Sequence, residues 1–253
     1  KRVASLDERV HYLSFSRNFG KEAALVAGLR HATGDYVAVM DADLQDPPEM
    51  LVEMFALIRT GEYDCIGTKR IDRKGEPPIR SFFARQFYQL INRISDTEIV
   101  DGARDYRLMT RQMVDAVLEM TEYNRFSKGI FSWVGFETKY LPYENQERVA
   151  GQTTWSFWSL FKYSLDGIVA FSEAPLAIAA LTGVLSFAVA ILGALIIVVR
   201  TLVFGNETSG WTSLIVIILG MGGLQLLCLG ILGKYLGKTF METKRRPLYI
   251  LKE

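Results

Sequence analysis

Residues 34–48, "GDYVAVMDADLQDPP", join a short apolar run to a group of acids. The run at 36–40 is too short for a helix, and its apolar composition predicts a strand buried in a sheet. Asp41 and Asp43 follow directly at its end. Because ligands of open α/β sheets gather at the carboxyl ends of strands, this position predicts a functional site.

Helical and strand-like segments alternate on both sides of this stretch. Residues 17–31 have the pattern of a loop entering a helix, and 64–68 form a second strand candidate. Between them, Asp46 can cap a helix that has prolines in its first turn and ends near Gly61. This βαβ rhythm predicts an α/β domain with a partly parallel, Rossmann-like sheet.

The chain begins within this rhythm, since residues 9–18, "RVHYLSFSRN", are already strand-like. A sheet of this kind usually has more strands ahead of such a segment. We therefore expect further strand and helix units to precede residue 1.

Asp41, Asp43 and Gln45 occupy alternate positions along the chain. Residues i and i+2 of an extended segment face the same side, so both carboxylates can approach one cation. Gln45 continues the series with a neutral oxygen, and hard divalent ions prefer oxygen ligands. The pattern predicts a site for Mg²⁺ or Mn²⁺ together with a diphosphate. Its alternative is a solvated acidic turn before a helix, since Asp and Pro are common in turns.

The composition excludes some classes of partner. The 253 residues carry a formal net charge of +1, without the strong basic field that nucleic acid requires. Cys65 lies near a predicted strand and Cys228 in an apolar segment, so we expect no disulfide and a reducing compartment. Neither cysteine has metal-ligand spacing.

Residues 174–199 and 209–233 hold no charged side chain. Each exceeds the ~20 residues that a helix needs to cross a ~30 Å hydrocarbon core, which predicts a two-helix transmembrane hairpin. Five basic residues follow the second span, whereas the loop between the spans has only Arg200. The positive-inside rule therefore places residues 1–153 in the cytoplasm, as part of a multi-pass protein of the cell membrane.

Residues 154–173, ahead of the first span, are rich in aromatic side chains. This favours a helix at the membrane interface, and a linker helix inside the protein is the alternative. Both alternatives also stay open for residues 80–94, where apolar side chains at helical spacing alternate with arginines. The expected organisation is an α/β domain at 1–153, the juxtamembrane helix, and the hairpin with its basic tail at 174–253.

The stretch "DADLQDPPEM", with "FSRNFGKEAALVAGLRHATGDY" before it, resembles polyprenyl-phosphate glycosyltransferases of the family 2 type. These include the bactoprenol glucosyltransferases and the dolichol-phosphate mannosyltransferases, which have a GT-A fold. The resemblance continues through 101–111, "DGARDYRLMTR", and 147–155, "ERVAGQTTW". The family's N-terminal strand, which holds the nucleotide, has no counterpart before Lys1.

This resemblance implies the inverting transfer of a sugar from a nucleotide sugar, with UDP-glucose as the expected donor, to a polyprenyl phosphate such as undecaprenyl phosphate. Asp41, Asp43 and Gln45 match positions that surround a divalent metal and the donor's diphosphate. Asp105 matches an aspartate near the reacting centre. Because planar guanidinium groups pair phosphate oxygens, we also expect phosphate contacts from arginines. The candidates are Arg70, Arg80, Arg85 and Arg148.

The role of Asp105 stays open at this point. An acceptor phosphate is already largely anionic at neutral pH, so a strong general base is less necessary. Asp105 can act as a base, anchor a sugar hydroxyl, or stabilise the positive charge that develops on the sugar. The alternative is a structural ion pair with Arg104 or Arg107, and Asp101 is the second candidate carboxylate.

Other functions fit parts of the sequence. GDP-mannose and UDP-N-acetylglucosamine are alternative donors. A processive polysaccharide synthase would need more spans and a Gln-x-x-Arg-Trp motif, which "QTTW" at 152–155 lacks. A membrane scaffold without enzymatic activity is the alternative from another class. The small residues at 220–223, "GMGG", suit helix packing within the hairpin or between the subunits of a homo-oligomer.

Overall fold

A computed structural model of the chain describes residues 2–42, 45–70, 86, 89, 91–95, 99–143, 165–204 and 210–252. The chain divides into two compact units. Unit 1 comprises residues 1–171 and 244–253, and unit 2 comprises residues 172–243.

The described part of unit 1 is built on a four-stranded sheet with the strand order β1-β3-β2-β4. Strand β3 runs antiparallel to β1 and β2, whereas β4 pairs with β2 in parallel. The sheet is therefore mixed, and the predicted α/β class with a partly parallel sheet is confirmed. The strands are β1 (Tyr36–Val39), β2 (Cys65–Arg70), β3 (Ala103–Thr110) and β4 (Thr138–Tyr143).

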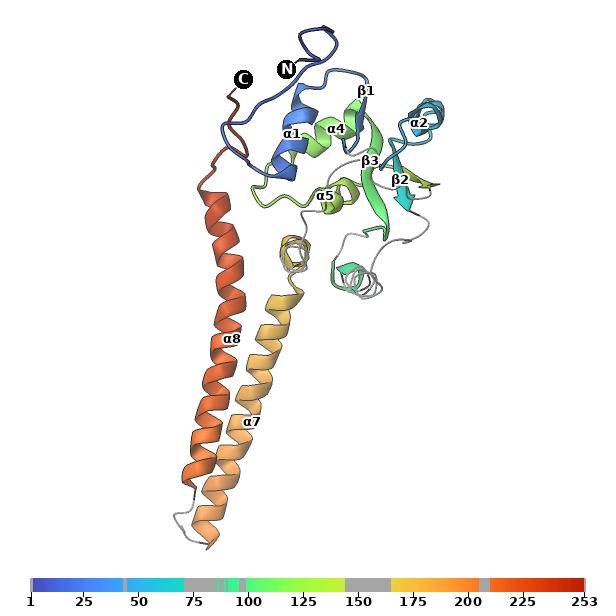
Figure 1. Cartoon of the computed structure of the whole chain (residues 1–253). Helices are drawn as coiled ribbons and strands as arrows, with labels where there is room; N and C mark the ends of the chain where they lie inside the picture. The colour runs from blue at the N-terminus through green and yellow to red at the C-terminus, as the bar shows by residue number, and fades with distance from the viewer. Residues whose placement is uncertain are drawn as a thin grey trace. The chain divides into compact units, whose positions relative to one another are not determined.

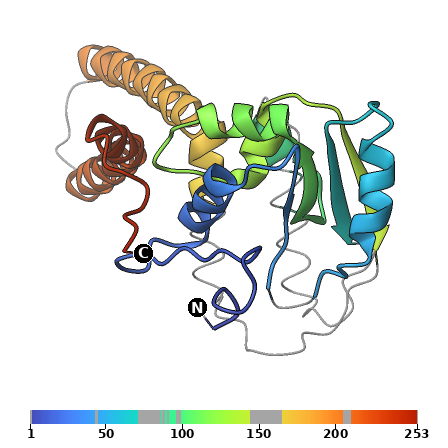
Figure 2. The same cartoon turned by 90° about the horizontal axis from the view of Figure 1, so that it is seen from above.

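Helices cover both faces of this sheet. Helices α1 (Lys21–His31), α4 (Arg111–Glu119) and α5 (Ser127–Trp133) lie on one face and α2 (Met50–Ile58) lies on the other (Figures 1 and 2).

The core follows from the alternation of side chains along the strands. Cys65 and Met109 point to the face of α1, α4 and α5, where they pack with other buried residues of those helices. Their neighbours Ile66 and Leu108 point to the opposite face and pack against α2. Each face therefore has its own apolar cluster, as expected for a three-layer α/β/α arrangement.

Two local expectations around α2 had different outcomes. Gly61 lies just beyond the helix with φ +77°, the left-handed conformation that favours glycine at a helix end, as predicted. The predicted cap is wrong, because the N-cap residue is Glu49, and Asp46 lies deeper in the protein.

The strand at 36–40 is less buried than predicted: Val37 is 7% exposed, but Tyr36 is 37% and Met40 40% exposed. Strand β1 is one of the two edge strands of the described sheet, which explains this exposure.

The strand-like segment at 9–18 forms a single antiparallel bridge, between Phe15 and Leu251. The Ser16 N–H donates to the Ile250 carbonyl at 3.0 Å, and the Lys252 N–H donates to the Ser14 carbonyl at 2.7 Å. The C-terminal segment therefore pairs with the loop that precedes α1, within unit 1.

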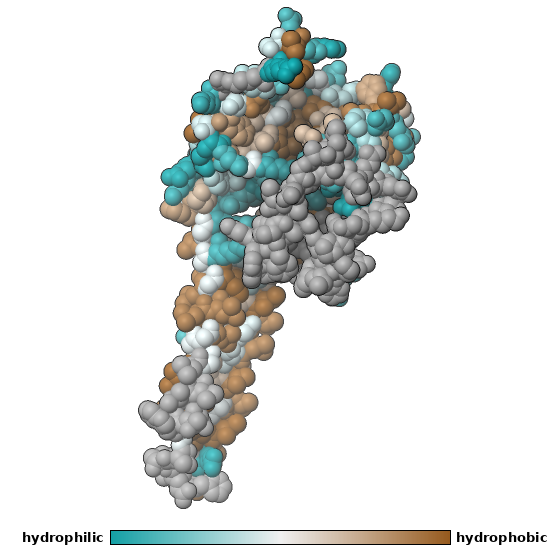
Figure 3. All heavy atoms as spheres, in the orientation of Figure 1, coloured by the Kyte–Doolittle hydropathy of each residue, from teal (hydrophilic) through white to brown (hydrophobic). Residues whose placement is uncertain are grey.

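Unit 2 consists of two long helices, α7 (Ala174–Phe204) and α8 (Trp211–Thr243), which run side by side (Figure 1). The first predicted span, 174–199, lies within α7, and the second, 209–233, overlaps α8 from residue 211 onward. Among the described residues, one stretch is long and apolar enough to cross a membrane: Ala174–Ile197, with a mean hydropathy of 2.5 and no buried part. Hydrophobic side chains dominate the described surface of both helices in Figure 3.

Two further segments are described in part. Ile91 is fully buried and packs with Ile99 and Phe126, but most of residues 80–94 lies outside the described part of the chain. Of the juxtamembrane segment, residues 165–171 are described as helical, and Phe171 packs against the same cluster. The aromatic residues at 155–163 lie outside the described residues.

Candidate functional site

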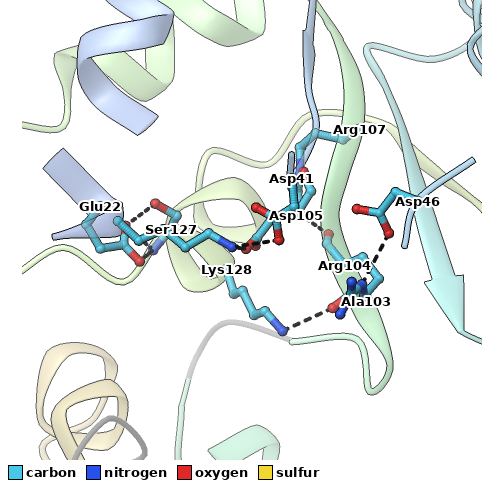
Figure 4. Close-up of polar contacts among 10 residues, drawn as sticks. Glu22, Asp41, Asp46, Ala103, Arg104, Asp105, Arg107, Ser127 and Lys128 are labelled. Carbon is cyan, nitrogen blue, oxygen red and sulfur yellow. Dashed lines mark hydrogen bonds and ion pairs between the residues drawn. The ribbon is translucent and has the colours of Figure 1, made fainter. Parts of the chain in front are cut away.

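The pairing of β1 with β3 brings two predicted site residues together. Val39 pairs with Arg107 in the antiparallel ladder of β1 and β3; Asp41 follows Val39 by two residues and Asp105 precedes Arg107 by two, so both lie beyond the same end of this pairing. The two aspartates are far apart in sequence, yet their carboxylates lie close together, Asp41 beyond the end of β1 and Asp105 within β3 (Figure 4). Asp41 thus follows the carboxyl end of β1, the position at which the sequence predicted a site.

A lysine bridges these two carboxylates. The Lys21 Nζ lies 3.0 Å from the Asp41 Oδ2 and 2.6 Å from the Asp105 Oδ2. The Asp105 side chain is 18% exposed, whereas those of Asp41 and Lys21 are 35% and 53% exposed. The bridge is therefore open to solvent on the side of Asp41 and Lys21 and more protected at Asp105.

Lys21 is held in place by the way α1 begins. It is the first residue of α1, and Gly20 before it has φ +91°, which a residue with a side chain rarely adopts. The Gly20 N–H donates to the Asn18 Oδ1 at 2.9 Å. On the other side of Lys21, the Glu22 carboxylate accepts hydrogen bonds from the Ser127 N–H and hydroxyl at the start of α5. The two helix starts are thus joined next to the site (Figure 4).

This junction brings a second lysine close to Asp105. Lys128 follows Ser127, and its Nζ donates to the Ala103 carbonyl at 3.1 Å. Burial alone would raise the pKa of Asp105, but the charges of Lys128, Lys21 and Arg107 outweigh it and hold this pKa below its ordinary value. For Lys21, burial would lower the pKa, but Asp105 and Asp41 together raise it. Asp105 is therefore an ionised carboxylate among several cations.

A buried carboxylate ties the acidic stretch to its neighbours. Asp46 is 1% exposed, and its Oδ1 accepts a hydrogen bond from the Tyr143 hydroxyl at 2.7 Å and from the Arg104 Nε at 3.4 Å. Burial and the adjacent carboxylate raise the pKa of Tyr143 to about 12. The Tyr106 hydroxyl also donates to the Pro47 carbonyl at 3.0 Å. These contacts explain why Asp46 does not cap α2.

The structure describes some of the other predicted residues and not others. Gln45 is half-buried in the turn before α2. Arg70 is the last residue of β2, and its N–H donates to the Gly102 carbonyl at 3.1 Å. Asp101 lies in the turn before β3. The residues that lie outside the described part are Asp43, Arg80, Arg85 and Arg148.

The ion-pair partners that the sequence suggested for Asp105 are wrong. Arg104 pairs with Asp46. Arg107 donates to backbone carbonyls, and its guanidinium carbon lies 3.7 Å from the centre of the Phe131 ring. The partner of Asp105 is Lys21, which belongs to the motif at 15–36 but was not predicted as a site residue. Its position at the start of a predicted helix is the feature of the sequence that could have indicated it. For Lys128 we find no comparable signal in the sequence.

The carboxylates of Asp41 and Asp105 suit a cation, because an ammonium group already lies between them. Among the described residues no group of three or more His, Cys, Asp or Glu is close enough to hold a metal ion, and Asp43 is not among those residues. The oxygen ligands that are described fit the chemistry of Mg²⁺ or Mn²⁺.

Comparison with known proteins identifies relatives along the whole chain. Residues 1–118 match the model of glycosyl transferase family 2. The putative glycosyltransferase CsbB of Bacillus subtilis is 44% identical over 100% of this chain and 76% of its own length. A prophage bactoprenol glucosyl transferase homolog of Escherichia coli is 43% identical, and the bactoprenol glucosyl transferase of Shigella phage SfV is 42% identical. Each of these two matches covers 99% of this chain and 81% of the relative.

Proposed function

Since this chain belongs to glycosyl transferase family 2, we propose that it transfers a sugar from a nucleotide sugar to a polyprenyl phosphate. The proposed donor is UDP-glucose and the proposed acceptor is undecaprenyl phosphate. The names of the relatives from Escherichia coli and Shigella phage SfV support the glucosyl group and the lipid acceptor.

The observation that carries this proposal is the meeting of Asp41 and Asp105 on one ammonium group. The two carboxylates come from adjacent strands, and two lysines lie beside them. Such a group of fixed charges suits a reaction in which a diphosphate leaves and an anionic phosphate attacks. A purely structural ion pair would not require a second lysine near the same carboxylate.

In the proposed reaction, an oxygen of the acceptor phosphate forms a bond to the anomeric carbon of the sugar. The bond between that carbon and the nucleoside diphosphate breaks, and attack from the opposite side inverts the anomeric centre. Asp41, with Asp43 and Gln45 from the same stretch of sequence, would hold Mg²⁺ or Mn²⁺. When bound, the metal would supply Lewis-acid stabilisation of the negative charge on the leaving diphosphate.

The electrostatics of Asp105 favour one of its open roles. A carboxylate whose pKa is held below the ordinary value is a weak general base at neutral pH. The acceptor phosphate is already largely anionic and needs little help in losing a proton. We therefore assign to Asp105 the binding of a sugar hydroxyl or the stabilisation of positive charge on the sugar, both of which need an ionised group.

The paired helices of unit 2 support a position in the membrane. Residues on both sides of unit 2 belong to unit 1, and Phe15 pairs with Leu251 across the two chain segments. If α7 crosses a membrane, the chain has to cross back before residue 244. Helix α8 is then the second span, and the protein has two crossings with its catalytic unit and basic tail in the cytoplasm.

The experiment is direct. Purified protein with Mg²⁺ or Mn²⁺, UDP-glucose and undecaprenyl phosphate is expected to form a lipid-linked glucose. Asp43→Asn should abolish this activity, because it removes a proposed metal ligand, while the circular dichroism spectrum stays unchanged. Parallel reactions with GDP-mannose and UDP-N-acetylglucosamine test the other donors. Failure to form product with any of the three donors would favour a non-enzymatic membrane scaffold.

A further inference from the structure

Lys21 holds together two carboxylates that a divalent cation would otherwise attract. We propose that Lys21 is a built-in counter-ion of this site: it binds Asp41 while no divalent cation is present, and it has to release Asp41 for the cation to bind. This inference rests on the proposed function, since it assigns a role to Lys21 in preparing the same site.

The charges explain why the cation-free site needs such a group. Two ionised carboxylates that lie this close repel each other, and the Lys21 ammonium, 3.0 Å and 2.6 Å from them, offsets this repulsion. The ammonium carries one positive charge, whereas Mg²⁺ or Mn²⁺ carries two. A divalent cation can therefore replace it on the more weakly held carboxylate.

The geometry identifies Asp41 as the carboxylate that is released. Its contact with Lys21 is the longer of the two, and its side chain is 35% exposed against 18% for Asp105. Lys21 reaches the site on a flexible four-carbon stem, whereas its backbone is fixed at the start of α1 by the contact of Glu22 with Ser127. The ammonium can thus leave Asp41 and stay on Asp105 without any movement of the helix.

The released ammonium would then face the substrates. Lysine binds phosphate as a point charge, so Lys21 on Asp105 would add a positive charge where a diphosphate leaves or a phosphate attacks. Lys21 is a positioning residue in the cation-free enzyme and becomes a substrate-contacting residue in the loaded enzyme.

The test measures Mn²⁺ binding to the purified full chain without donor or lipid, by electron paramagnetic resonance of the free ion. Lys21→Met removes the competing charge and should tighten Mn²⁺ binding about tenfold, given how strongly unit charges interact at these distances. Lys21→Arg keeps the charge and should bind Mn²⁺ as the unchanged protein does. Lys139→Met, which removes a lysine of β4 that contacts Tyr63, is the matched control and should have no effect.

A second measurement uses the unchanged protein and does not depend on a variant that folds. Acylation of Lys21 by an amine-reactive ester, followed by mass spectrometry, should be several-fold faster with Mn²⁺ than without it, because release from Asp41 removes one of the two ion pairs that hold the ammonium group. Acylation of Lys139 should not change.

The inference would be overturned if the unchanged protein and Lys21→Met bound Mn²⁺ equally well, or if neither bound it. It would also be overturned if Mn²⁺ did not accelerate the acylation of Lys21. Neither result depends on sugar transfer. A protein that forms lipid-linked sugar but shows no competition by Lys21 would refute this inference alone, whereas a protein that forms no product would refute the proposed function.

Discussion

Asp46 connects three segments that carry site residues. It follows the turn that holds Asp41, it bonds to Arg104 next to Asp105, and it bonds to Tyr143 at the end of β4. Residues 144–150, which include the candidate Arg148, come directly after Tyr143 in the chain. A single buried carboxylate therefore fixes the distance between the acidic turn, the central strand and the end of β4.

Removing one partner of this carboxylate should destabilise unit 1. Tyr143→Phe deletes a hydrogen bond to a buried charged group, a loss of about 1.5–3 kcal/mol. For a unit of this size we expect the melting temperature in detergent to fall by roughly 5 °C, as measured by differential scanning fluorimetry. The control is Tyr36→Phe, which keeps the ring that contacts Phe55 on the exposed side of β1. Equal melting temperatures for Tyr143→Phe and the parent would contradict this role of Asp46.

Glu22 should make stability depend on pH. Burial raises the pKa of Glu22 above its unfolded value, although its hydrogen bonds to Ser127 lower it in part. The contribution of Glu22 to stability is therefore fully present below the unfolded pKa and is lost as the pH rises through the folded pKa.

Glu22→Gln mimics the protonated form and removes this dependence. We expect the melting temperature of the variant minus that of the parent to increase by roughly 2 °C or more between about pH 4 and about pH 8. Thermal melts of both proteins across this range provide the measurement. A difference that stays constant over the range would show that Glu22 titrates at its unfolded value.

At the scale of elements, α5 packs so closely against the helical residues 165–171 that Gly129 has no room for a side chain. A Cβ added at Gly129 would lie 2.5 Å from the Phe171 ring, closer than real contacts allow. Gly129 is in the first half of α5, whose residues carry Ser127 and Lys128 to the site. This contact is therefore part of what fixes the start of α5.

Gly129→Ala should force the Phe171 ring out of its place. Overpacking of this kind costs about 1–3 kcal/mol, so we expect a lower melting temperature. Phe171→Ala in the same chain should recover part of the loss, which a double-mutant cycle would measure. Gly28→Ala is the matched control: it lies on the exposed side of α1 with no atom within 4 Å of the added Cβ and should stabilise the helix slightly. Strictly additive effects of Gly129→Ala and Phe171→Ala on stability would refute the contact between these two residues.

Most of the described elements could be predicted from the sequence because their signals are local. The strand before Asp41, the helix that ends ahead of Gly61, and the strand predicted at 64–68 and found as β2 each follow from composition and turn residues. The expectation for Asp46 was wrong for a physical reason. A cap is a contact within a few residues, whereas the partner of Asp46 is Tyr143, 97 positions away.

For the candidate site, the sequence predicted the carboxylates but not the lysines beside them. Asp41 and Asp105 were both identified, but their proximity follows from the pairing of β1 with β3, which no local pattern encodes. Lys21 and Lys128 reach Asp105 from the starts of two different helices, joined by Glu22 and Ser127. Long-range packing sets these positions, so a single sequence could suggest the carboxylates but not the cations around them.

At the scale of the whole molecule, the path of the chain constrains how it can sit in a membrane. The chain leaves unit 1 after residue 171, forms α7 and α8, and returns to unit 1 at residue 244. On its return, Tyr249 stacks on Phe15 with ring centroids 5.1 Å apart. An odd number of crossings would separate these two rings by a bilayer, so the number of crossings has to be even.

This argument predicts where reagents can reach the chain in intact cells. A cysteine introduced at Asn206, in the link between α7 and α8, should react with a membrane-impermeant maleimide added outside. A cysteine at Lys244, where the chain re-enters unit 1, should react only after the membrane is permeabilised, because the basic residues around it favour the cytoplasm. The parent chain, whose own Cys65 is buried, gives the background. Labelling of both positions from the same side would show that α8 does not cross the membrane, and the even number of crossings would then be zero.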